Sequence, residues 1–294
     1  MRLMEYVFPT KSRDHELFLY PIGDIHMGAS NCAEDKLKHL VARIASKPNA
    51  YWFGGGDLLD AVVFNDSKRF DPSILPDWML EHQGAEKIRK NLEDMLDAQF
   101  NRFCHVMEPI RERCLGMLEG NHEYAIMKHH NRNIMSDLAL HFSCPDLTDC
   151  AFVRFKFRRS GAHTDTVRGF LTHGHGGGRT SGAEPNILYR LAADKECEFV
   201  LKGHSHTFCI HPPIPVLSIP SSGEMPKDPV VYDKFAANWG SFLYTYKSGP
   251  STYASRANYP VRPMYTAECR IRPHIAIPGG SSDRPLVEIN AVRL

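Results

Sequence analysis

Five short polar motifs, each combining glycine with aspartate, asparagine or histidine, recur along this sequence. They are Gly23-Asp24-Ile25-His26, Gly54-Gly55-Gly56-Asp57, Gly120-Asn121-His122-Glu123, His173-Gly174-His175 and Gly203-His204-Ser205-His206. Nearly every motif comes just after an apolar run that we expect to form a buried strand, over residues 16–22, 50–53, 114–118, 169–172 and 199–202. Because α/β folds place their functional groups at the carboxyl ends of strands, the motifs are expected to meet at one rim of a sheet.

The segments between the motifs indicate the fold class. Residues 32–46 carry apolar residues at helical spacing between the first two expected strands, and strand, helix, strand is the unit of an α/β fold with a layered core. Residues 64–113 change in character and predict a helical insertion with a long helix from about residue 84. Such an insertion acts either as a lid or as plain scaffolding. Residues 225–294 are expected to form a β-rich extension of a single domain spanning 1–294.

Composition narrows the possible partners. The 35 basic and 34 acidic residues give a net charge of +1, so no global basic field favours nucleic acid, although a local patch remains possible. No apolar run reaches the length of a membrane span, and no secretory signal is visible, so we expect a cytoplasmic protein. The eight cysteines contain no C-x-x-C pair, which argues against a zinc knuckle and against a dithiol redox site. No sequence feature indicates an oligomeric state.

The motif residues suit a pair of divalent metal ions. Two metals about 3.5–4 Å apart need a carboxylate that both can share, and Asp57 is the candidate for that role. Asp24 and His26 lie two residues apart on an extended segment and can bind one metal together. Asn121 offers a neutral carbonyl oxygen, and imidazoles can be supplied by His204, His206 and His173. Within His173-Gly174-His175, we favour His173 as the ligand and place His175 beside it as an orienting group.

In its order and spacing, this motif set resembles the calcineurin-like metallophosphoesterase superfamily, over roughly residues 17–220. The resemblance implies a four-layer αββα sandwich of two mixed β-sheets flanked by helices, with a dinuclear site at the sheet edges. It implies that one metal is held by Asp24, His26, Asp57 and His206, and that the other is held by Asp57, Asn121, His173 and His204. The expected cofactors are two divalent ions, with Mn favoured and Fe, Zn, Co or Ni as alternatives.

The resemblance also implies roles for residues that do not bind metal. His122 is expected to meet the substrate phosphate and protonate the leaving oxygen, so His122 and Asp57 are the candidate catalytic residues. Glu123 and Asp60 are expected to orient imidazoles. Arg179, after a glycine-rich turn, together with His129 and Arg132, forms a candidate substrate-binding set, with a solvated loop as the alternative.

The predicted function is a metal-dependent phosphoesterase in which a metal-bound hydroxide attacks the phosphorus. A phosphodiester substrate, either a small molecule or a nucleotide, is favoured, because the rim is expected to be open and neutral to basic and no extra recognition motif is present. The alternatives are a phosphomonoesterase acting on proteins or nucleotides and a DNA nuclease of the same superfamily. A non-catalytic protein that keeps the fold is disfavoured because such proteins lose ligands, and here the set is whole.

Overall fold

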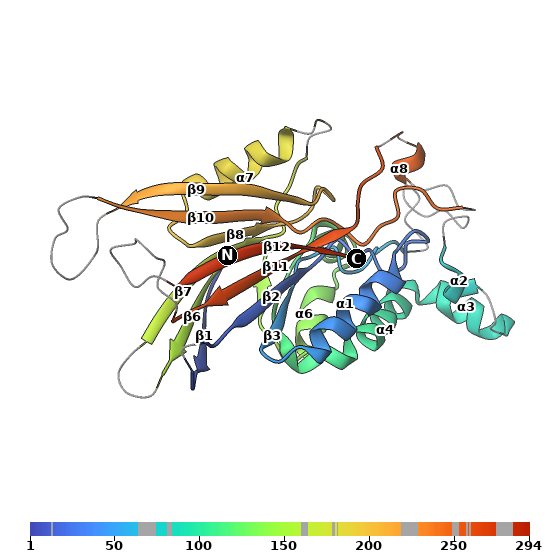
Figure 1. Cartoon of the computed structure of the whole chain (residues 1–294). Helices are drawn as coiled ribbons and strands as arrows, with labels where there is room; N and C mark the ends of the chain where they lie inside the picture. Colours follow the sequence, from blue (N-terminus) through green and yellow to red (C-terminus); the bar gives the residue numbers. More distant parts are fainter. Residues whose placement is uncertain are drawn as a thin grey trace.

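The computed structural model describes residues 1–12, 14–63, 75–80, 84–159, 164–177, 180, 182–218, 229–248, 253–256, 258, 260–274 and 285–294. Its strands form two sheets of six (Figure 1). Sheet I has the order β1-β6-β7-β8-β10-β9, and sheet II has the order β12-β11-β2-β3-β4-β5. Both sheets mix parallel and antiparallel pairs.

The strand bounds are as follows. Sheet I is built from β1 (Arg2–Pro9), β6 (Cys150–Arg158), β7 (Thr164–Thr172), β8 (Phe199–Lys202), β9 (Cys209–Ser218) and β10 (Val230–Asn238). Sheet II is built from β2 (Leu17–Ile22), β3 (Ala50–Gly54), β4 (Cys114–Leu118), β5 (Asp146–Thr148), β11 (Tyr265–Arg272) and β12 (Leu286–Arg293).

The described helices are α1 (Glu34–Ser46), α2 (Asp77–Leu80), α3 (Ala85–Glu93), α4 (Met95–Met107), the 3₁₀ helix η2 (Glu108–Arg113), α5 (Asn121–His130), α6 (Ile134–His141), α7 (Ala183–Ala193) and α8 (Tyr253–Arg256). The outer face of each sheet is covered by helices, whereas α2 and α3 extend away from the sheets (Figure 1). Helices α1, α4 and α6 lie on one side of the molecule, and α7 lies on the opposite side against sheet I (Figure 1).

Three buried clusters fill the spaces between these layers. The central cluster joins residues of both sheets, such as Phe53 and Leu118 with Phe155 and Phe199. A second cluster packs sheet II against α1, α4 and α6, and a third packs sheet I against α7. In β6, buried residues alternate with more exposed ones. Because successive side chains of a strand point to opposite faces, only one face of β6 contacts the central core. The four-layer αββα sandwich predicted from the sequence is therefore confirmed.

The region before β4 differs in detail from its prediction. Instead of one long helix from residue 84, there are two helices, α3 and α4, separated at Asp94, whose φ of −113° and ψ of 44° are not helical. Residues 64–74 and 81–83 of the expected insertion lie outside the described residues. The division of the chain into one domain with an insertion and an extension stays a prediction. No helix among the described residues is long and apolar enough to cross a membrane.

The topology brings the motifs to one edge of the sandwich. In sheet II, β2, β3 and β4 are parallel neighbours, so their carboxyl ends lead together into Gly23, Gly55 and Gly120. In sheet I, β7, β8 and β10 are also parallel, and they end at Thr172, Lys202 and Asn238. The two rims meet where Asp24 accepts a hydrogen bond from the His204 main-chain N–H at 3.1 Å.

Candidate metal centre

The backbone at this edge adopts conformations that are unfavourable for most residues. Positive φ angles, between 48° and 71°, occur at five of the seven predicted ligands: Asp24, His26, Asp57, His204 and His206. A left-handed conformation costs an L-residue roughly 1–2 kcal/mol, so such residues persist only where the surrounding structure enforces them. Clustering of this strain at one rim is independent evidence of a functional site.

Asp24, His26, Asp57 and His206 form the first group of side chains that could hold a metal ion, since one ligand atom of each lies within 4.8 Å of the others. The Nε2 atoms of His26 and His206 face each other at 3.1 Å, and the His206 Nε2 lies 3.3 Å from Asp24 Oδ1. Two imidazole lone pairs at this separation repel unless a proton or a cation lies between them. The group therefore fits a bound cation.

His173, His204 and Asp57 form the second group. His173 Nδ1 lies 2.8 Å from the carbonyl oxygen of Gly55; since a carbonyl only accepts, Nδ1 carries a proton. The other ring nitrogen, Nε2, points toward Asp57 Oδ2 at 3.4 Å and Asn121 Oδ1 at 3.2 Å. His204 Nδ1 approaches the same Asn121 oxygen at 2.7 Å. Nε2 is thus the His173 nitrogen that could bind a metal in place of a proton.

Asp57 lies between the two groups. Its Oδ1 accepts a hydrogen bond from the main-chain N–H of His122 at 3.0 Å, at the start of α5. Its Oδ2 lies 3.8 Å from His26 Nε2 on one side and 3.4 Å from His173 Nε2 on the other. Asp57 Oδ1 is thus hydrogen-bonded to the start of α5, and Asp57 Oδ2 faces both groups of side chains, which is the position that a ligand shared by two metals needs.

The electrostatics of the site favour positive charge. Burial opposes protonation of His173, but the carboxylates of Asp57 and Asp24 outweigh it and raise the pKa of His173 to about 9. Burial also opposes ionisation of Asp57, yet His173 and His26 hold its pKa far below the usual range. Burial and the neighbouring histidines lower the pKa of His26 and of His204. Carboxylates that stabilise an imidazolium here would also stabilise a divalent ion in its place.

Taken by chemical type, the donors are carboxylate, imidazole and amide oxygen. This set suits Mn, Fe, Zn, Co or Ni. The structure brings together the seven residues that were predicted as ligands from the sequence: Asp24, His26, Asp57, Asn121, His173, His204 and His206. Their assignment to particular ions stays a prediction.

His122 and Asp60 are joined beside the first group. His122 Nδ1 donates to the main-chain oxygen of Asp60 at 2.6 Å, which leaves Nε2 as the ring atom that can exchange a proton with another molecule. The Asp60 carboxylate lies 3.6 Å from His26 Nδ1, consistent with its expected orienting role. Burial opposes protonation of His122, but Asp57 and Asp60 raise its pKa.

Glu123 takes a different role from the expected one. It contacts main-chain amides rather than an imidazole: Oε2 accepts from Asp57 at 3.0 Å and Gly120 at 3.1 Å, and Oε1 accepts from Leu58 at 2.7 Å and Leu59 at 3.0 Å. Burial, together with the charge of Asp57, raises the pKa of Glu123 to about 7. Glu123 therefore fixes the turn that carries Asp57.

Four residues that sequence reasoning missed support the turn with His204 and His206. Lys202 and Glu184 form a buried ion pair at 3.2 Å, and Lys202 Nζ also donates to the Gly203 carbonyl oxygen at 2.8 Å. Asn238 donates to Glu184 at 2.8 Å and to Ser205 Oγ at 2.8 Å. The fourth residue, Trp239, reaches Asp24 through its indole N–H. A lysine at the end of an apolar strand was the only sequence signal for this network.

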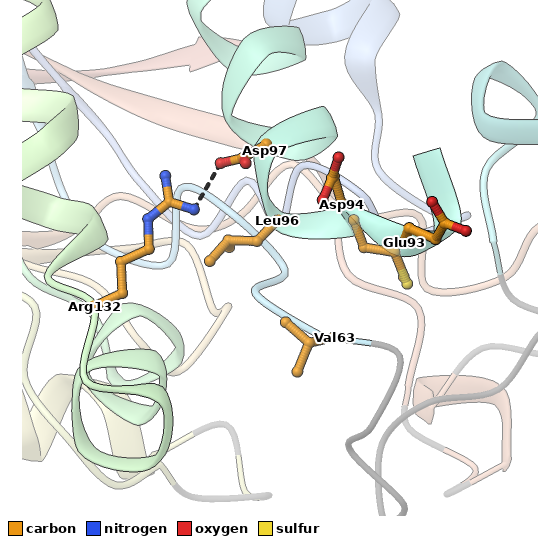
Figure 2. A pocket seen from close by; sticks show the side chains of 7 residues that line it. Val63, Glu93, Asp94, Leu96, Asp97 and Arg132 are labelled. Carbon is orange, nitrogen blue, oxygen red and sulfur yellow. Dashed lines mark hydrogen bonds and ion pairs between the residues drawn. The ribbon is translucent and has the colours of Figure 1, made fainter. Parts of the chain in front are cut away.

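Of the expected substrate-binding residues, Arg132 is engaged away from the metal-binding groups. Arg132 points to Asp97 of α4 across a surface pocket, at 2.6 Å (Figure 2). It also pairs with Asp137 at 3.1 Å. Its guanidinium is thus engaged by two carboxylates. His129 is exposed on α5, and His175 is exposed after β7, rather than packed beside a ligand as expected. Arg179 lies outside the described residues.

No protein-family model matches the chain, and no curated protein matches it. Among solved structures, a conserved uncharacterized protein from Streptococcus pneumoniae TIGR4, called a predicted phosphoesterase, aligns with 95% of this chain and 99% of its own. The sequence identity is 13% and the TM-score is 0.32. These values are too low to assign a shared fold or function, so we infer function from the chain's own residues.

Proposed function

We propose that this protein is a metal-dependent phosphoesterase of the calcineurin-like type, and that it hydrolyses phosphodiesters at a dinuclear centre. The observation that carries the proposal is the position of Asp57, whose Oδ2 lies between His26 Nε2 at 3.8 Å and His173 Nε2 at 3.4 Å. A carboxylate shared by two sets of imidazole and oxygen donors is what a pair of catalytic metals requires.

Bound metals would lower the pKa of a water molecule and neutralise phosphate oxygens. Asp24, His26, Asp57 and His206 would hold one ion, and Asp57, Asn121, His173 and His204 would hold the other. His122, fixed by its Nδ1 hydrogen bond to Asp60, would protonate the leaving oxygen through Nε2. Asp60 keeps both His26 and His122 oriented, and Glu123 keeps the Asp57 turn in place.

A diester is favoured over a monoester by the openness of the site. Asn121 is exposed, and the His206 side chain is 32% exposed, so the site reaches the surface at these two residues, although Asp24, His26, Asp57 and His173 are buried. An open rim leaves room for a substituent on both sides of the phosphorus, and a diester carries two.

The test is metal analysis of the purified protein, followed by rate measurements with Mn on bis-p-nitrophenyl phosphate, p-nitrophenyl phosphate and single-stranded DNA. We expect two metals per chain and the highest rate on the first substrate. Asp57→Asn should lose both metal and activity, while the surface change Asp194→Asn should keep both. A protein that binds no metal, or that binds metal and hydrolyses none of the three, would refute the proposal.

A further inference from the structure

Two cysteines that are far apart in the sequence are in contact in the structure. The Sγ atoms of Cys114 and Cys144 lie 3.4 Å apart, with the Cys114 thiol directed at Cys144. Cys114 begins β4, and Cys144 follows α6. The Cys144 main-chain N–H donates a hydrogen bond to the Ala139 carbonyl oxygen at 3.0 Å. The absence of a C-x-x-C motif argued against a dithiol site, but folding assembles a thiol pair from separate segments.

Cys114 and Cys144 lie at the two ends of a segment that contributes residues to the metal centre. The chain between Cys114 and Cys144 contains α5 and α6, and α5 begins with Asn121, His122 and Glu123. A covalent bond between the two sulfurs would close a loop around the segment that supplies these residues to the metal centre. The bond would tie the end of α6 to the strand that leads into α5.

Small molecules can approach the pair from outside. A surface pocket is lined by Cys114 and by Phe142 and Ser143, which directly precede Cys144, together with two arginines and two glutamates. Both Cys114 and Cys144 are partly exposed. A partly exposed thiol beside a pocket is accessible to a small disulfide oxidant.

We propose that Cys114 and Cys144 form a reversible disulfide when the protein meets a disulfide oxidant such as oxidised glutathione. One thiol of the pair, as its thiolate, attacks one glutathione sulfur, the glutathione S–S bond breaks, and one glutathione thiolate leaves. The other thiol passes its proton to that thiolate and attacks the protein sulfur of the mixed disulfide, which releases the second glutathione. The protein loses two hydrogens and gains one S–S bond, while one oxidised glutathione becomes two reduced molecules.

Burial and the neighbouring sulfur raise the pKa of the Cys114 thiol well above its ordinary value. Because both thiols are partly exposed, either sulfur can take up the first glutathione, and the other then resolves the mixed disulfide. Each single variant therefore lacks a resolving thiol.

The test exposes the full-length protein to oxidised glutathione, alkylates the remaining thiols under denaturing conditions and measures the mass of the chain and its peptides. We expect the loss of two hydrogens, a Cys114–Cys144 cross-linked peptide, and reversal by dithiothreitol. Closing this loop should raise Tm by roughly 5 °C. Glutathione adducts that never resolve, cross-links to other cysteines only, or no reaction would overturn the proposal. None of these measurements depends on the proposed phosphoesterase activity.

Single variants identify the two sulfurs. Cys114→Ser and Cys144→Ser should each stop at a glutathione adduct on the remaining thiol of the pair, because the resolving thiol is missing. Cys104→Ser removes another thiol, in α4, and should oxidise as the unaltered protein does. If Cys114→Ser does not fold, as judged by its circular dichroism, Cys114→Ala replaces it. Formation of the disulfide mass in either single variant would overturn the assignment.

Discussion

Trp239 donates a hydrogen bond from its indole N–H to Asp24 Oδ2 at 2.8 Å, although the two residues are 215 positions apart. Trp239 follows β10 of sheet I, whereas Asp24 follows β2 of sheet II. The indole ring also lies against Gly23, Gly55 and Gly203, where a side chain would overlap it. Trp239 therefore links the rim of sheet I to the rim of sheet II and orients the carboxylate of Asp24, a predicted metal ligand.

Replacing Trp239 by Phe should weaken metal binding more than folding. Phenylalanine keeps an aromatic ring against the three glycines but removes the donor to Asp24. Loss of a partner to a metal-binding carboxylate typically costs 10–100-fold in metal affinity. Isothermal titration of the apo protein with Mn would measure the affinity. Thermal unfolding in the presence of a chelator would measure the stability, and a large fall in Tm with unchanged affinity would contradict this prediction.

Gly120→Ala should disrupt the centre through steric overlap. An added Cβ at this position would collide with the Asp57 main-chain nitrogen and with its carboxylate. Since both belong to a turn fixed by Glu123, we expect destabilisation by about 2 kcal/mol or more and loss of metal binding. Gly84→Ala is the matched control because its Cβ would meet no atom within 4 Å. Urea unfolding of both variants distinguishes them, and equal stabilities would refute the steric account.

Glu123→Gln tests the hydrogen bonds that the Glu123 carboxylate accepts in the turn that carries Asp57. One oxygen can still accept from two main-chain N–H groups, but the new amide group would face the other two, which are also donors. Buried donors left without acceptors cost about 1–3 kcal/mol each. We therefore expect a loss of about 2–4 kcal/mol in the free energy of unfolding, measured without metal. An unchanged stability would show that Glu123 is replaceable at this turn.

The sequence was informative where local chemistry decides the structure. Asp24, Asp57 and Asn121 each follow a strand of sheet II and a glycine, and parallel neighbours bring such residues to one rim. His204 follows a strand of sheet I and joins them because the two sheets pack together. The roles that depend on long-range packing were not predictable in this way. Trp239 and Asn238 reach the site because β10 lies next to β8, although β9 intervenes in the sequence.

The incorrect expectations for Arg132 and Glu123 also result from long-range packing. Arg132 was expected at the substrate site because it follows the motif with Asn121. Instead, Asp97 of α4 and Asp137 of α6 engage its guanidinium, and the packing of these helices is invisible in local sequence. Glu123 was expected to face an imidazole, but four main-chain donors converge on it once the turns after β3 and β4 are side by side.

Stability should depend on pH through Glu34, which links α1 to α4. Its carboxylate pairs with Arg102 through two hydrogen bonds and with Lys38 at 2.6 Å. Burial opposes ionisation, but these cations lower the pKa of Glu34 in the folded state. The contribution to stability is therefore present above the unfolded pKa of about 4.3 and is lost as pH falls through the folded value.

Glu34→Gln should accordingly be less stable by about 1–2 kcal/mol at neutral pH, and the difference should shrink as the solution is acidified below about pH 4. Urea unfolding over a pH series, with chelator present to remove metal effects, measures this difference. A gap between the two proteins that stays constant with pH would show that the pair contributes nothing through its charge.

His122→Ala should lower turnover while leaving the metal in place. No ring atom of His122 is needed by the two groups around Asp57, so metal content should match that of the unaltered protein. If His122 protonates the leaving oxygen, its loss should cost about 10²–10⁴-fold on an ester with a poor alkoxide leaving group. The loss should be much smaller for p-nitrophenolate, which departs without a proton. Equal losses on both substrates would assign His122 to phosphate binding instead, and loss of metal would make it a ligand.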